Sequence, residues 1–152
     1  MSVFARCMSI AACAAILGTG TIAAASKPEV NVGNGRVAVK GYDVVAYFTS
    51  GRPVKGSSRF TVEWKGAEWH FSTAEHRQAF EAAPDQYAPQ FGGYCAWAVS
   101  RGYTADVDPN AWRIVAGRLY LNYSRRVQRQ WENDIPGNIA KAEAHWPAVL
   151  DK

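Results

Sequence analysis

The stretch WHFSTAEHRQAF, which runs from Trp69 to Phe80, predicts the end of a strand followed directly by the start of a helix. The segment STAE within it has the spacing of a capping box, so we expect Ser72 to cap a helix that begins at about Thr73. His76 lies one helical turn after Ser72 and one turn before Phe80, so these three side chains should share a face. That face determines how the helix packs on the strand.

Two antiparallel hairpins are expected around this stretch. In SRFTVEWKGAEWHFS, apolar residues alternate on both sides of a Lys65-Gly66 turn; they are Phe60, Val62 and Trp64 before the turn and Trp69 and Phe71 after it. In WRIVAGRLYLNY, a second pair of strands turns near Ala116-Gly117. The residues around Ala46, in YDVVAYF, form an apolar run that we expect to be a further strand.

Short helices complete the expected fold. Pro84 should end the helix that begins near Thr73. Two further helices are expected near residues 94–100 and from Ser124 to about Asp134. Pro136-Gly137 should separate the second of these from a last helix that ends near Trp146. There is no repeat and no low-complexity linker. The pattern therefore predicts a single small α+β domain with antiparallel hairpins and several short helices.

The first 25 residues predict a secretory signal peptide. Arg6 is followed by an uncharged, Ala-rich stretch that ends on Ala23-Ala24-Ala25, the small-x-small pattern that signal peptidase accepts. The residues Gly18 to Thr21 interrupt the apolar run, which argues against a membrane anchor. We therefore expect cleavage before Ser26 and an exported protein, periplasmic or secreted, without a membrane span.

Cleavage would leave 127 of the 152 residues, with residues 26–35 as a flexible lead-in and residues 36–152 as the domain. Two of the three cysteines lie in the predicted signal peptide, so only Cys95 remains and no disulfide can form within the mature chain. Loss of Arg6 lowers the formal net charge from +4 to +3. Because the basic residues are scattered, we do not expect a nucleic-acid partner.

Three residues are candidates for chemistry. His76 lies at the positive end of its helix, which should keep its imidazole neutral and able to bind a metal, but it could equally be a hydrogen-bonded core histidine. Cys95 follows Gly92-Gly93 and is either a buried, inert residue or a thiolate ligand or redox-sensitive thiol. Asp43 lies in an apolar run, as a turn cap or a third member of a site. His70 and His145 are expected at the surface.

Enzyme motifs are missing from the sequence. It contains no CxxC, HExxH or GxSxG motif and no convincing phosphate-binding loop. A cysteine-based enzyme would need His76 within about 3–4 Å of an exposed Cys95, with the histidine as the base. We therefore expect that the protein is not an enzyme.

Three segments together resemble the exported YHS-domain proteins, a branch of the YHS family related to small metal-binding modules of the treble-clef or TRASH type. The segments are YDVVAYF, WKGAEWHFSTAEHRQAFEAAPDQYAPQFGGYCAWAV and GRLYLNY, and the resemblance covers nearly all of the predicted mature chain. The stretch from Trp69 to Thr73 is similar to the aromatic-His-Phe-Cys/Ser-Ser stretch of the family. Phe80, Pro84 and Tyr87 match the pattern that follows it.

The resemblance implies an ancestry of metal binding. The metal-binding relatives have cysteines where this chain has Ser72 and His76, and another near Ala46, so His76 alone retains a good donor. A rebuilt site would use His76 and Cys95, with Asp43 as a third member, and would suit copper or zinc. We expect a binding or accessory protein with a transition-metal role. The alternative is a metal-free structural or protein-interaction module.

Overall fold

The computed structural model describes residues 26–152, so the predicted signal peptide lies outside the described residues. The helices are α1 (Ala46–Thr49), α2 (Ala74–Ala82), α3 (Pro84–Tyr87), α4 (Ala96–Ser100), α5 (Arg125–Glu132) and α6 (Ile135–His145). The strands are β1 (Ser57–Trp64), β2 (Ala67–Phe71), β3 (Asp108–Val115) and β4 (Arg118–Asn122). Short 3-10 helices are η1 (Ala38–Gly41), η2 (Phe91–Gly93) and η3 (Ala148–Asp151). None of the described helices has the length and apolar character needed to cross a membrane.

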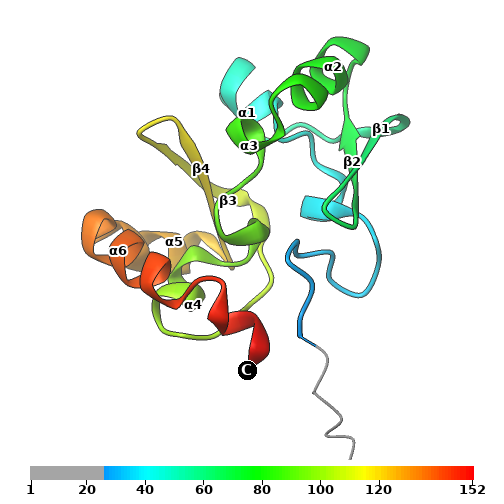
Figure 1. The fold of residues 1–152 in the computed structure, drawn as a ribbon. Coiled ribbons are helices and arrows are strands. Elements are labelled where there is room, and N and C mark those ends of the chain that lie inside the picture. The colour runs from blue at the N-terminus through cyan, green and yellow to red at the C-terminus, as the bar shows by residue number, and fades with distance from the viewer. Residues whose placement is uncertain (1–25) are drawn as a thin grey trace, which may run out of the picture.

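The predicted α+β class and both predicted hairpins are confirmed. Strand β1 pairs with β2 in antiparallel register, with Val62 opposite Trp69, and β3 pairs with β4, with Trp112 opposite Leu121. Each hairpin forms its own two-stranded sheet. Figure 1 shows the first hairpin and α2 at one end of the molecule, with α4, α5 and α6 near the second hairpin at the other end.

Aromatic side chains form the core in both parts. Trp69, Phe71 and Phe80 are all but inaccessible to solvent, and the Phe80 ring lies 5.0 Å from the Trp69 ring and 5.1 Å from the Phe71 ring. These contacts fix α2 on β2, as the apolar face of the opening stretch predicted. In the second cluster, the rings of Tyr120 and Trp131 lie 5.3 Å apart. Full burial of one such side chain contributes roughly 1.5–3 kcal/mol.

The prediction of a strand around Ala46 is wrong. Residues Ala46–Thr49 form the single helical turn α1, and Ala46 and Tyr47 within it are buried. The Tyr47 hydroxyl donates a hydrogen bond to the Pro109 carbonyl, 2.8 Å away, which ties the turn to the start of β3. A short apolar run that is buried on all sides has no periodicity that separates a strand from a helical turn.

Two details of the helix ends also differ from expectation. Thr73 caps α2, because its Oγ1 accepts a hydrogen bond from the His76 N–H at 3.1 Å, whereas Ser72 makes other contacts. Pro136 and Gly137 lie inside the first turn of α6 and do not precede it; Asp134 caps that helix. Proline is compatible with this position because the first-turn N–H groups have no partner within the helix.

The segment expected as a flexible lead-in is partly packed. Val30 is 2% exposed and belongs to the first core cluster. The Asn31 amide donates hydrogen bonds to the Gly93 carbonyl and to Asp106 Oδ1, at 3.2 and 3.1 Å. Composition alone suggested a loose segment, but these long-range partners hold it against the domain.

Candidate functional site

Asp43 is a fully buried carboxylate that closes the turn before α1. Its Oδ1 accepts hydrogen bonds from the backbone N–H groups of Val45 and Ala46, at 2.9 and 3.2 Å. The side chain is 0% exposed. The turn-capping interpretation of Asp43 is therefore confirmed.

The second carboxylate oxygen of Asp43 joins three segments of the chain. Its Oδ2 accepts hydrogen bonds from the Ser72 N–H at 2.8 Å and from the Ser72 hydroxyl at 2.5 Å. The same oxygen lies 2.6 Å from His76 Nδ1. The α1 turn, the end of β2 and the first turn of α2 are thus held by one buried anion. Hydrogen bonds to a charged group contribute more than neutral ones, roughly 1.5–3 kcal/mol each.

The two ring nitrogens of His76 face different groups, a buried carboxylate and an exposed hydroxyl. Because the Asp43 carboxylate accepts a hydrogen bond, Nδ1 of His76 carries a proton. Nε2 lies 3.1 Å from the exposed Thr49 hydroxyl and would present a lone pair to it in the neutral form of the ring. The His76 side chain is 20% exposed, so this nitrogen lies near the molecular surface. Asp43, Ser72, His76 and Thr49 together form a set that we call the Asp43 network.

Cys95 lies in a different environment. Its Sγ accepts a hydrogen bond from the backbone N–H of Tyr123 at 3.3 Å. The thiol donates a hydrogen bond to Asn122 Oδ1 at 3.7 Å. The residue is 1% exposed, and desolvation by this burial raises the pKa of the thiol. A raised pKa keeps sulfur in the thiol form, whereas metal ligation and nucleophilic attack both require the thiolate.

The three predicted donors do not converge. Among residues 26–152, no group of three or more His, Cys, Asp or Glu side chains is placed to hold a metal ion. Asp43 and His76 meet at the start of α2, whereas Cys95 immediately precedes α4 and is bonded to Asn122 and Tyr123. The residues present therefore do not fit one site built from His76, Cys95 and Asp43.

The other two histidines are less exposed than the sequence suggested. His70 has a 15% exposed side chain, and its Nε2 lies 2.5 Å from Glu68 Oε1. His145 is half-buried, and its Nδ1 lies 2.9 Å from the Val99 carbonyl. The sequence analysis also missed Thr49 and the bond between Ser72 and Asp43, because both depend on contacts between distant segments.

The geometry can be compared with known families. The YHS domain family matches residues 45–91, from the turn before α1 to the start of η2. The chain contains a YHS domain. No curated protein and no solved structure matches the chain. The matched residues include His76, whereas Asp43 and Cys95 both lie outside them.

Proposed function

We propose that this protein is an exported, non-catalytic accessory protein whose YHS domain serves as a metal-free module for binding a partner protein. Export rests on the predicted signal peptide. The presence of the YHS domain supports descent from metal-binding relatives of the treble-clef or TRASH type. Where the resemblance places two ligand cysteines, this chain has Ser72 and His76, and both contact Asp43.

The observation that carries the proposal is the saturation of Asp43. Its two oxygens have five hydrogen bonds to four residues of the chain, so binding a metal there would break contacts that hold α1, β2 and α2 together. The network replaces a metal in one structural respect, because a buried anion with donors from three segments fixes them in place. Burial raises the pKa of the Cys95 thiol, and its hydrogen-bond partners are Asn122 and Tyr123 and not the Asp43 network, which supports a structural role for the thiol.

Metal titration of the mature protein, residues 26–152, tests the proposal. We expect that zinc or copper(I) at 100 μM leaves the melting temperature unchanged and produces no thiolate charge-transfer band. A site with a dissociation constant of 1 μM would stabilise the protein by about 2.7 kcal/mol at that concentration, a shift of several degrees. Such a shift, lost in His76→Gln or Cys95→Ser but kept in His145→Gln, would show that a metal site is present.

A second candidate function rests on Nε2 of His76, which lies beside the exposed Thr49 hydroxyl. A carboxylate that accepts from one imidazole nitrogen orients the ring so that the other nitrogen can ligate a metal. Asp43 does this for His76 and leaves Nε2 near the surface. A copper or zinc ion held there would need its other ligands from solvent or from a partner. A metal-dependent 15N shift of His76 Nε2, without a change at Cys95, would favour this candidate over the metal-free module.

A further inference from the structure

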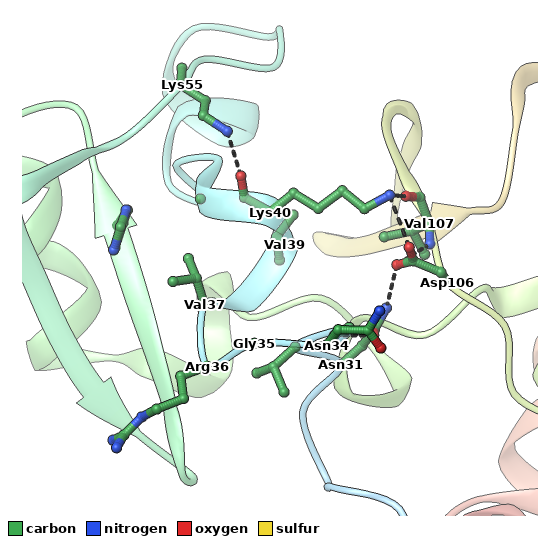
Figure 2. A pocket seen from close by; sticks show the side chains of 14 residues that line it. Asn31, Asn34, Gly35, Arg36, Val37, Val39, Lys40, Lys55, Asp106 and Val107 are labelled. Atoms are coloured by element: carbon green, nitrogen blue, oxygen red, sulfur yellow. Dashed lines mark hydrogen bonds and ion pairs between the residues drawn. The ribbon is translucent and has the colours of Figure 1, made fainter.

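A second feature of the molecule is a cavity that no residue of the Asp43 network lines. The cavity, of about 480 Å³, opens between the segment from Asn31 to Gly41, the side chains of Lys55 and His70, and the pair Asp106-Val107 (Figure 2). These residues come from distant parts of the chain, so the cavity exists only in the folded protein. Neither His76 nor Cys95 lines it.

The lining of the cavity is mainly apolar. Val32 and Val37 supply partly exposed side chains, and Figure 2 shows the long Lys40 chain crossing from η1 towards Asp106 and Val107. Lys40 Nζ donates to the Val107 carbonyl at 2.7 Å, which leaves its methylene groups along the wall. Such a surface suits the apolar body of a small molecule.

The charged groups of the cavity are unequally paired. Burial opposes the ionisation of Asp106, but the Lys40 ammonium and the N–H groups of Val107 and Asn31 outweigh it and lower the pKa of this carboxyl. Asp106 is therefore an anion already neutralised by Lys40, 3.0 Å away. Lys55 has no ion-pair partner among the described residues; its ammonium bonds to the Lys40 carbonyl and lies 4.7 Å above the Tyr42 ring.

Lys55 and His70 converge on a vacant point at Gly41. A Cβ atom added to Gly41 would lie 3.6 Å from Lys55 Nζ, 3.4 Å from His70 Nδ1 and 3.7 Å from a methyl group of Val37. Glycine leaves this point empty. An anionic oxygen near it could accept from the Lys55 ammonium, whereas the His70 Nε2–H already faces the Glu68 carboxylate, so Nδ1 of the neutral ring has no proton to donate.

The backbone at this point is strained. Val39, Lys40 and Gly41 have positive φ values of 49°, 53° and 78°. This left-handed conformation is unfavourable for a β-branched residue such as Val39. Strain of this kind persists where the surrounding structure enforces it, and it is concentrated at ligand sites. Here it turns the Lys40 carbonyl to the Lys55 ammonium and sets the position of the vacant point.

We propose that this cavity binds a small organic anion, with its carboxylate at the Lys55 ammonium and its apolar body against Val32, Val37 and the methylene groups of Lys40. Among the described residues, Arg36 is paired with Glu63 and Lys40 with Asp106, so Lys55 is the lining cation whose charge remains for an anion. The apolar walls favour an organic carboxylate over inorganic phosphate. The site is independent of the proposed partner-binding function and of any metal at His76.

Benzoate is the probe for this site, with benzamide as its uncharged analogue. In 15N-labelled protein comprising residues 26–152, we expect benzoate to shift the amide signals of residues 31–41, 106 and 107, with a dissociation constant on the order of 1 mM. Benzamide should bind at least fivefold more weakly, because it cannot form the charge-assisted bond to Lys55. Equal binding of the two compounds, or no shifts in these residues at 20 mM benzoate, would refute the proposal.

Matched variants locate the anion. Lys55→Met removes the charge while keeping the chain length, and we expect it to weaken benzoate binding at least fivefold. Lys141→Met is the control, because Lys141 is exposed on α6 and does not line the cavity. Lys55→Gln provides a second variant should Lys55→Met not fold. Equal affinity of these variants and the control would overturn the assignment, and so would phosphate competing with benzoate at equal concentration.

Discussion

At the scale of single residues, the position of Asp43 explains more of this site than that of His76. His76 is notable in the sequence because it lies on the same helical face as Phe80. In the structure its ring is oriented by Asp43, which also accepts from two backbone N–H groups of the α1 turn and from Ser72. A buried carboxylate is stable only when such donors surround it. The role of His76 therefore depends on Asp43.

Replacing Asp43 tests this dependence. Asp43→Asn keeps the shape but places an amide among N–H and O–H donors, so we expect a loss of about 3 kcal/mol in the free energy of unfolding. Urea denaturation followed by Trp fluorescence measures it. The control is Asp151→Asn, at an exposed position near the C-terminus, which should change stability by less than about 0.5 kcal/mol. Equal effects of the two substitutions would contradict the structural role of the network.

At the scale of elements, two neighbouring residues at the start of α2 have different roles: Thr73 caps the helix and Ser72 binds Asp43. Ser72 and Thr73 are adjacent hydroxyl residues, and the capping-box spacing selected Ser72. Thr73 is the cap because its backbone is extended, with φ −140°, and its oxygen accepts from the His76 N–H. Ser72 is bonded to Asp43 through its own N–H and hydroxyl, so it is not available to cap the helix.

Substitutions at Thr73 test the assignment of the cap. Thr73→Ala removes the acceptor for the His76 N–H, and we expect it to lower the free energy of unfolding by about 1 kcal/mol. Thr73→Ser is the matched control, because it keeps the hydroxyl and should stay within about 0.5 kcal/mol of the parent. Urea denaturation compares the three proteins. An alanine variant as stable as the serine variant would show that Thr73 is not the cap.

At the scale of the whole molecule, packing determines what Cys95 can do. The cysteine lies before α4 and is covered by contacts with the residues that end β4 and follow it. A lone cysteine in a predicted exported chain could be a reactive thiol on sequence grounds. Burial and the raised pKa of the thiol disfavour that reaction in the folded state.

Thiol labelling measures this protection. We expect iodoacetamide at pH 8 to label Cys95 at least a hundredfold more slowly in the native protein than in 6 M guanidinium chloride, because reaction requires the domain to open. Labelling across a urea series should follow the unfolding transition seen by Trp fluorescence. Fast labelling of the native protein, well below that transition, would indicate an accessible and reactive thiol.

The sequence by itself determined the local features of this protein. Alternation around Lys65-Gly66 and Ala116-Gly117 predicted both hairpins, and Pro84 predicted the end of α2. These depend on interactions between residues close in the chain, so periodicity and turn composition reveal them. The YHS resemblance was also detectable there, and its family match confirms the domain within residues 45–91.

Only the tertiary structure decided which side chains meet. Asp43 and His76 are 33 positions apart in the sequence yet lie in contact, whereas Cys95, also a strong candidate, is absent from their network. Lys55 and His70 likewise lie apart in the sequence, yet both side chains lie beside Gly41. Contacts of this kind depend on how the hairpin, α1 and η1 pack together. No local pattern records that packing, because the free energy that fixes it is distributed over the whole core.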